Sequence, residues 1–245
     1  MQHPLFDLVV FLVATIAGGV AALSGFGIGS LLTPLLATAT GMKLAVAAVS
    51  IPHFVATGTR LWKLRKHVDM RTMLNFGIFS AAGGLLGALF ESKANSRSLS
   101  VVFGVLLVFA GLSGLMGWMA RVRFGRTAAW GAGFLSGFFG GLVGNQGGIR
   151  SAALMAFPLD KEGLVATATA IGVIVDLARM PVYVAAQGYA LVSVSGWIVL
   201  ALAGCLAGTF WGVRLLGRIP ARVYRPLLSG LICALGVWMI VRVVL

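Results

Sequence analysis

The sequence predicts an all-α membrane protein made of two inverted repeats, each with a broken short-helix hairpin followed by three transmembrane helices. Three observations favour this fold class. Of the 245 residues, 59% are hydrophobic and 10% are charged, whereas about a quarter of the residues of a soluble domain are charged. Apolar runs long enough to span a bilayer follow one another along the chain. These runs also fall into two series of the same order.

The basic residues gather in short gaps between the apolar runs. The chain has 19 Lys and Arg against 6 Asp and Glu, a formal net charge of +13, which in a soluble protein would suggest a nucleic-acid partner. Basic residues in such gaps instead indicate which loops face the cytoplasm. We therefore expect contact with the lipid bilayer and none with nucleic acid. The N-terminus, MQHPLFD, lacks the basic region of a cleavable signal peptide, and we expect it in the mature protein.

The two series of runs define two repeats, residues 1–120 and 121–245, within one membrane domain. Shifting the sequence by 119 residues aligns several glycines and also aligns Arg60 with Arg179; later the shift becomes 121, where Gly83 and Gly87 meet Gly204 and Gly208. An intramembrane arginine that matches another one is stronger support than the glycines. The runs of the first repeat are 5–41, 43–62, 72–90 and 98–118, and those of the second are 128–158, 163–186, 192–213 and 223–245.

The first run of each repeat is interrupted. The run 128–158 is too long for one span and too short for two spans with a turn, and its middle reads GLVGNQGGIR. The first repeat has LSGFGIGSLLTP at the same place. We expect two short helices that meet at a broken turn, because irregular backbone at membrane depth is tolerated only against protein or a water-filled cavity. Paired interruptions in two halves indicate a binding site.

The loop charges predict that the repeats are inverted. The loop near 63–71 and the region 213–225 are rich in Lys and Arg, whereas their repeat counterparts near 187–192 and 91–97 have few or none. Because cytoplasmic loops carry the excess of basic residues, the halves have opposite orientations, related by a two-fold axis in the membrane plane. Both termini are expected on the non-cytoplasmic side.

The second interruption has the residue types of an anion site. Arg150 follows Asn145, Gln146, Gly147 and Gly148 at the start of a half-helix. The N–H groups and the dipole at a helix N-terminus favour anions, and an adjacent guanidinium adds a permanent positive charge. The alternative is that Arg150 pairs with a distant carboxylate or extends to the membrane surface.

A second group of titratable residues lies in the helices that follow the hairpins. Asp176 and Arg179 are three residues apart and so share one helix face. They form either a structural ion pair or a coupling pair, in which protonation of Asp176 frees Arg179 for the substrate. His53 is the other candidate for coupling or is a hydrogen-bonded core histidine. We interpret Arg60 as a residue at the membrane boundary, whose long side chain extends its charge toward the surface.

The first repeat can complete the site. Thr57, Asn75 and the glycine turn of Gly25, Gly27 and Gly29 are its candidate residues. Gly83–Gly87 and Gly204–Gly208 have the spacing of closely packed helices. The two cysteines, Cys205 and Cys233, have no metal-type spacing, and we expect neither a cofactor nor a metal.

The paired glycine segments resemble the sulfite exporter TauE/SafE family of membrane permeases. The first copy is LSGFGIGSLLTPLLATATGMKLAVAAVS, and the second is GFLSGFFGGLVGNQGGIRSAALMAF followed by GLVATATA. The resemblance covers nearly the whole chain. It implies a transporter in the bacterial inner membrane, often linked to export of sulfite or sulfonates and in other members to organic anions.

These observations lead us to expect a secondary transporter, not an enzyme, that moves a small anion by alternating access with proton coupling. Sulfite and sulfoacetate are the expected kinds of substrate. A small-carboxylate transporter and an anion channel are the alternatives. An intramembrane enzyme is disfavoured because only His53 of three histidines lies inside a run. Whether the chain acts alone or as a homodimer is left open.

Overall fold

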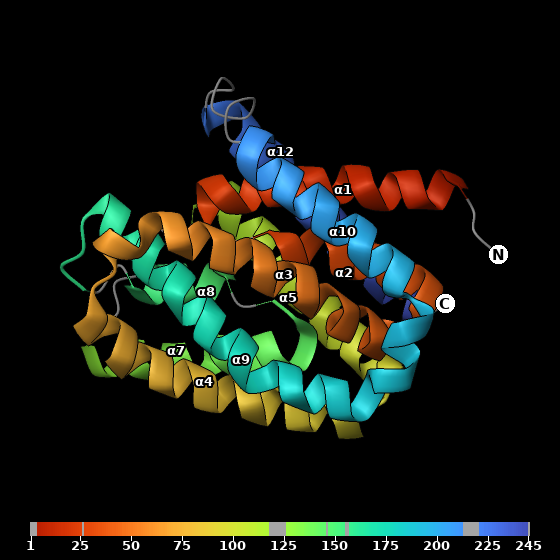
Figure 1. The fold of residues 1–245 in the computed structure, drawn as a ribbon, viewed down its shortest axis with the longest axis horizontal. Coiled ribbons are helices and arrows are strands. Elements are labelled where there is room, and N and C mark those ends of the chain that lie inside the picture. The colour runs from red at the N-terminus through yellow and green to blue at the C-terminus, as the bar shows by residue number, and fades with distance from the viewer. Residues whose placement is uncertain are drawn as a thin grey trace.

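The computed structural model describes residues 4–25, 27–117, 126–145, 147–154, 157–212 and 221–244 (Figure 1). All regular secondary structure in these ranges is helical. The all-α fold class is therefore confirmed.

The first half of the chain forms an interrupted helix pair and three long helices. The pair is α1 (Pro4–Ser24) and α2 (Ile28–Thr40), broken at Gly25–Gly27. Then come α3 (Met42–Leu64), the short 3₁₀ turn η1 (Arg65–His67), α4 (Met70–Lys93) and α5 (Ser96–Met116). Side-chain caps set two of the starts, because Asp69 accepts from the Thr72 amide and Asn95 from the Ser98 amide.

The second half repeats this order. It consists of α7 (Arg126–Val143) and the eight-residue α8 (Gly147–Leu154), then α9 (Lys161–Ser193), α10 (Ser195–Ala207) with the π-helical turn η2 (Gly208–Gly212), and α12 (Ala221–Val244). The expected breaks near residues 25 and 145 are both present.

One predicted connection is wrong. The sequence suggested a loop over Gln187–Val192, but α9 continues through it to Ser193, so that only Val194 separates α9 from α10. The single glycine there, Gly188, costs a helix only about 1 kcal/mol. No proline stands in this stretch to end the helix.

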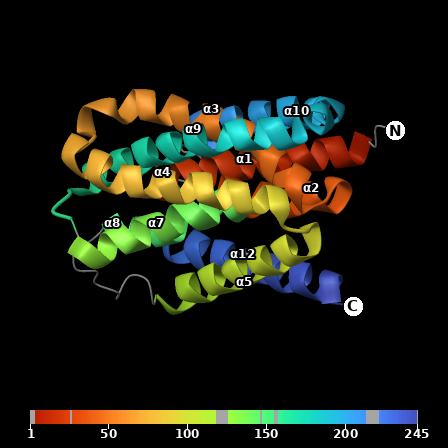
Figure 2. The ribbon, with the colours of Figure 1, turned by 90° about the horizontal axis from the view of Figure 1, so that it is seen from below.

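Two long helices, α3 and α9, form the middle of the bundle. More than half of each span is buried, against 39% or less of the other four candidate spans. Six of the other helices pack as pairs that each join one half of the chain to the other: α4 with α7, α1 with α10, and α5 with α12 (Figure 2). The two halves are thus interleaved rather than side by side.

Several of these pairs pack backbone against backbone at glycines. A Cβ atom on Gly87 would lie 2.0 Å from the Phe138 carbonyl oxygen, and one on Gly208 would lie 2.0 Å from that of Thr15. On α7, a Cβ at Gly137 would lie 1.9 Å from the carbonyl oxygen of Ser80. Small residues let helices approach this closely in a membrane, where packing replaces the hydrophobic effect.

The outside of the bundle suits a lipid environment. Large apolar side chains are exposed along the outer helices, among them Leu8 and Ile16 on α1, Ile78 and Phe90 on α4, and Leu227 on α12. Six helices in the described ranges are long and apolar enough to cross a membrane. A soluble protein rarely exposes apolar surface so extensively. The chain is therefore an integral membrane protein.

The bundle has two distinct ends. Both chain termini lie at one end, which we call the terminal end; the opposite end, which we call the basic end, carries η1 and the start of α9 (Figures 1 and 2). Lys63 and the η1 residues Arg65, Lys66 and His67 belong to the basic end. By the loop charges, this is the end expected in the cytoplasm.

The glycine packing can be tested with two substitutions on the same helix. We expect Gly137→Val to destabilise the protein by about 1–3 kcal/mol, because the added side chain meets the backbone of α4. Gly131→Val is the matched control, since a Cβ at Gly131 has open space around it. Thermal unfolding in detergent measures both; equal melting temperatures would show that the close approach of α4 and α7 is not needed.

Candidate functional site

The two interrupted helix pairs meet in the middle of the bundle. Gly29, at the start of α2, lies so close to the turn after α7 that a Cβ on it would be 2.2 Å from the Gly144 carbonyl oxygen. A small polar pocket opens at this meeting point. It is lined by Gly25, Gly27, Gly29, Ser30, His53, Gly144, Asn145, Gly147 and Arg150.

Glycine is required at both turns because of the backbone conformation. Gly25, Gly27 and Gly144 have φ angles of 81°, 135° and 76°, in the region that residues with a side chain adopt only with strain. Gly27 precedes the first turn of α2 and provides no side-chain cap. The first backbone N–H groups of α2 therefore lie beside the pocket, and no side-chain oxygen of residue 27 caps them.

Arg150 is the positively charged residue of the pocket. It lies on the first turn of α8, is 4% exposed, and donates from Nη1 to the Ala168 carbonyl oxygen at 3.0 Å. No carboxylate in the described part of the chain lies within ion-pair distance of it. Its guanidinium fits into a space left by Gly172 of α9, where a Cβ would be 2.8 Å from Nη1.

His53, Asp176 and Arg179 form one buried network beside the pocket. His53 Nδ1 lies 2.6 Å from Asp176 Oδ2, and Arg179 Nε and Nη2 lie 2.9 and 2.8 Å from Asp176 Oδ1. Asp176 is 0% exposed and Arg179 is 2% exposed. His53 also lines the pocket. The predicted one-turn pairing of Asp176 and Arg179 is present, and the structure adds the histidine from the other half.

Two arginines bind the carbonyl groups where the interrupted helices end. Arg179 Nη1 donates to Gly140 O in the last turn of α7, and Arg60 Nη1 donates to Ala21 O in the last turn of α1. Ala21 and Gly140 are themselves 119 residues apart, like the two arginines. Each of these carbonyls also accepts from the backbone N–H of the following turn glycine, Gly25 or Gly144, at 2.9 Å. The arginine is therefore a second donor, and its charge stabilises the partial negative charge of the helix C-terminus.

The interpretation of Arg60 as a surface-seeking residue is wrong. Its side chain is 8% exposed and its Nε also donates to Thr169 Oγ1 at 3.2 Å. The sequence position of Arg60 near Lys63 suggested the membrane boundary. The guanidinium instead binds the end of α1 and Thr169 in the protein interior.

The other predicted residues are distributed around the pocket. Thr57 and Arg179 do not line it; Thr57 packs with Arg150 against Gly172. Asn75 is exposed on the outer helix α4 and takes no part. Gly148 lies in α8, and Gln146 falls outside the described residues.

Sequence reasoning missed several buried polar side chains. Ser30 lines the pocket, and the Thr33 hydroxyl is buried without a hydrogen-bond partner in the described structure, as is that of the predicted Thr57. Tyr183 donates to Gly141 O and stacks with Arg179. Glu91 is fully buried at the end of α4. Ser30 and Thr33 look like ordinary helix residues, but Glu91 and Tyr183 at the ends of apolar runs could have been noticed as candidates.

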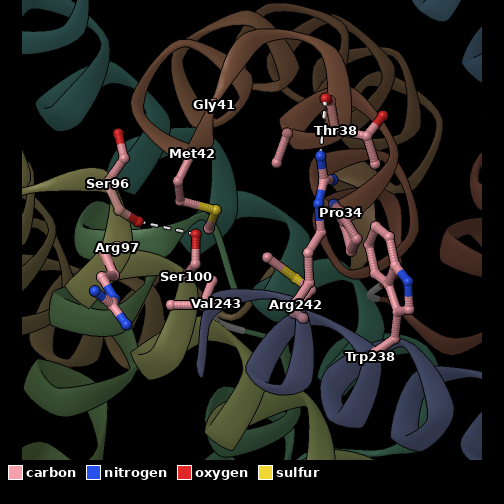
Figure 3. A pocket seen from close by; sticks show the side chains of 12 residues that line it. Pro34, Thr38, Gly41, Met42, Ser96, Arg97, Ser100, Trp238, Arg242 and Val243 are labelled. Carbon is pink, nitrogen blue, oxygen red and sulfur yellow. Dashed lines mark hydrogen bonds between the residues drawn. The ribbon is translucent and has the colours of Figure 1, made fainter. Parts of the chain in front are cut away.

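A second and larger pocket lies at the terminal end. It has a volume of about 240 Å³ and is formed by the outer end of α2, the starts of α3 and α5, and the end of α12. Figure 3 shows Arg242 turned toward Thr38 across this pocket, with Arg97 and Ser96 on the other side. Helix α2 therefore connects the two pockets, since its inner end borders the first one.

The central charges are unbalanced. The guanidinium groups of Arg60, Arg150 and Arg179 face the single carboxylate of Asp176 in the buried middle of the described structure. No cluster of His, Cys, Asp or Glu that could hold a metal occurs among the described residues. An added anion would reduce this excess positive charge, which is costly in a medium of low dielectric constant.

Comparison with known proteins identifies the family. The family model described as sulfite exporter TauE/SafE matches residues 10–239. No curated protein and no solved structure matches the chain. The matched range contains both interrupted helix pairs and every residue of the central pocket. The chain belongs to the sulfite exporter TauE/SafE family, a family of membrane transporters.

Proposed function

We propose that the chain is a proton-coupled secondary transporter that exports a small sulfur oxyanion or organosulfonate, such as sulfite or sulfoacetate, by alternating access. The observation that carries the proposal is the position of Arg150. It is a buried cation without a carboxylate partner in the described structure, and it lines the pocket beside the start of α2, whose first N–H groups have no acceptor within the helix. Sulfonate and sulfite oxygens accept hydrogen bonds from such donors.

The size of the pocket supports a conformational cycle. Its interior is about 10 Å³, the space that one water molecule needs, so a sulfur oxyanion does not fit while the glycine turns touch. The turns must separate to admit a substrate. Since the turns belong to different halves, a relative movement of the halves would open the pocket.

The matched arginine contacts support an inverted pair of repeats, residues 1–120 and 121–245. Arg60 on Ala21 and Arg179 on Gly140 are equivalent bonds in the two halves. The pair α4–α7 is equivalent to the pair α1–α10, because α1 corresponds to α7 and α4 to α10, and the pair α5–α12 joins two equivalent helices. With such a two-fold relation, the pocket can open toward either end of the bundle, and the two open conformations have similar energy.

The His53–Asp176 pair is the proposed coupling element. A proton added to this pair places one more positive charge beside the pocket, which favours a bound anion. Thermodynamic linkage then requires that anion binding favours protonation of the pair. Arg179 remains held by Asp176 and Gly140; protonation of Asp176 would weaken the first of these contacts and free part of the guanidinium for the substrate.

We expect Arg150→Ala to weaken binding of sulfite or sulfoacetate by at least about tenfold, equal to 1.4 kcal/mol, because the only cation that lines the described pocket is lost. Membrane insertion should be unaffected. Thermal unfolding in detergent with sulfite, sulfate, sulfoacetate, acetate and chloride measures the binding, since a ligand specific for the folded state raises stability.

The control for this experiment is Arg65→Ala, which removes an exposed arginine from η1. An anion-induced stabilisation of equal size in Arg150→Ala and in the wild type would refute the assignment of the site. A response to acetate but not to the sulfur anions would favour the alternative of a small-carboxylate transporter.

Gly172→Val tests the site without removing its charge. The new side chain occupies the space of the Arg150 guanidinium, and we expect anion affinity to fall by about tenfold or more while Arg150 remains. Gly188→Val on the same helix is the control, because a Cβ there meets nothing. The same unfolding assay compares them; unchanged affinity in Gly172→Val would mean that the position of Arg150 does not matter.

His53→Gln tests the coupling. In the wild type, affinity for a sulfonate should rise as the pH is lowered, because a proton added to the pair adds positive charge beside the anion. The variant should bind within about threefold of the wild type at neutral pH but lose this pH dependence. A sulfonate is the right probe because it stays ionised, whereas sulfite itself titrates near neutrality.

His67→Gln is the control, since His67 is exposed and pairs with Glu162 at the basic end. If His53→Gln keeps the pH dependence of the wild type, the coupling role of this pair is wrong. Export by the wild type that ignores an imposed pH gradient would instead indicate an anion channel.

A further inference from the structure

A second buried carboxyl group, Glu91, lies outside the central site. Its side chain is 0% exposed, and neither of its carboxyl oxygens has a hydrogen-bond partner in the described structure. It stands near the C-terminal end of α4, in the last turn before Ala94. A buried polar group without a partner costs about 1–3 kcal/mol, and such groups within membrane segments are commonly functional.

The surroundings of Glu91 do not neutralise a negative charge. No cation of the described chain lies within ion-pair distance of it. Lys43 of α3 interacts with it electrostatically, but the Lys43 ammonium donates to the carbonyl oxygen of Ser92 at 2.9 Å. An unpaired carboxylate in the protein interior is strongly disfavoured, so the neutral, protonated acid is the form that suits this conformation.

The position of Glu91 connects it with the central network. Tyr183 lies two turns after Asp176 on α9, about 10.5 Å along the axis, and its hydroxyl donates to Gly141 O. Gly141 packs directly against Ala88 of α4, where a Cβ would be 2.8 Å from the Ala88 nitrogen. Glu91 is three residues beyond Ala88 and therefore on the same face of α4.

The charged and titratable groups around Glu91 come from two helices, α3 and α9. Lys43 faces it from α3, and Tyr183 interacts with it from α9. The described side chains of α7, the helix most extensively packed on α4, include no titratable group. Lys43 thus lies between Glu91 and the terminal end, and Tyr183 lies between Glu91 and the middle of the bundle.

We propose that Glu91 is a proton-binding site between the His53–Asp176 pair and the terminal end of the bundle. It holds a proton in the present conformation. When the terminal side opens, the O–H bond of the carboxyl group breaks, the proton passes to water, and Lys43 leaves Ser92 to pair with the carboxylate. This inference rests on the proposed proton coupling, since it supplies the group that exchanges the coupled proton with the outside.

Infrared spectroscopy of the detergent-purified protein tests the proton directly and needs no substrate. The wild type should show the C=O stretch of a protonated carboxyl group, which shifts in heavy water and disappears on raising the pH. Glu91→Gln should lack this band, and Asp176→Asn should keep it. Identical bands in Glu91→Gln and the wild type would overturn the proposal.

Transport in vesicles tests the role. Glu91→Gln mimics the neutral acid and removes no ion pair, so the protein should fold and its sulfoacetate-induced stabilisation should equal that of the wild type. Its transport should lose the dependence on the pH at the terminal side that the wild type shows. Glu162→Gln, which changes an exposed glutamate at the basic end, should behave as the wild type.

The outcomes separate this inference from the proposed function. If sulfoacetate stabilises the wild type and Glu91→Gln keeps the wild-type response to pH, Glu91 has no coupling role while the anion site stands. If no anion stabilises the wild type, the proposed function fails, and the infrared band still decides whether Glu91 binds a proton.

Discussion

The bonds from two buried arginines to the ends of the interrupted helices are the interactions on which the structure depends. A helix that stops inside a membrane ends in carbonyl groups that carry partial negative charge and have no water to solvate it. Arg60 and Arg179 each reach one of these helix ends from the long central helix of the same half. Asp176 in turn balances Arg179, and His53 links that carboxylate to the other half.

This arrangement explains why a polar pocket can exist at the centre. With the helix ends held, the glycine turns approach until Gly29 meets Gly144, and no side chain fills the space between their backbones. Arg150 and Arg60 are both buried without a carboxylate at ion-pair distance in the described structure, but only Arg150 of the two lines the pocket. Arg60 and Arg179 bind helix ends, whereas Arg150, the arginine proposed to bind the substrate, faces the pocket.

Much of the fold could be predicted because it follows from composition and periodicity. The long apolar runs, the glycine breaks and the loop charges are local properties, and they indicated the helices and the interruptions. The end of α9 was placed too early because a glycine and a few polar residues resemble a loop. Of the site, Arg150 and the Asp176–Arg179 pair could be expected from their neighbours in sequence, whereas the contacts of Arg60 and Tyr183 and the lack of a partner for Glu91 in the described structure could not.

The sequence by itself determined the membrane environment, the helical class, the interruptions and the family-specific glycine segments, because each depends on residues that are close along the chain. Only the tertiary structure decided which groups meet: His53 with Asp176 across 123 residues, Arg60 with the end of α1, and Glu91 with no partner in the described chain. Contacts of this kind depend on how α3, α4 and α9 pack, and helix packing is set by shape complementarity between distant segments rather than by local pattern.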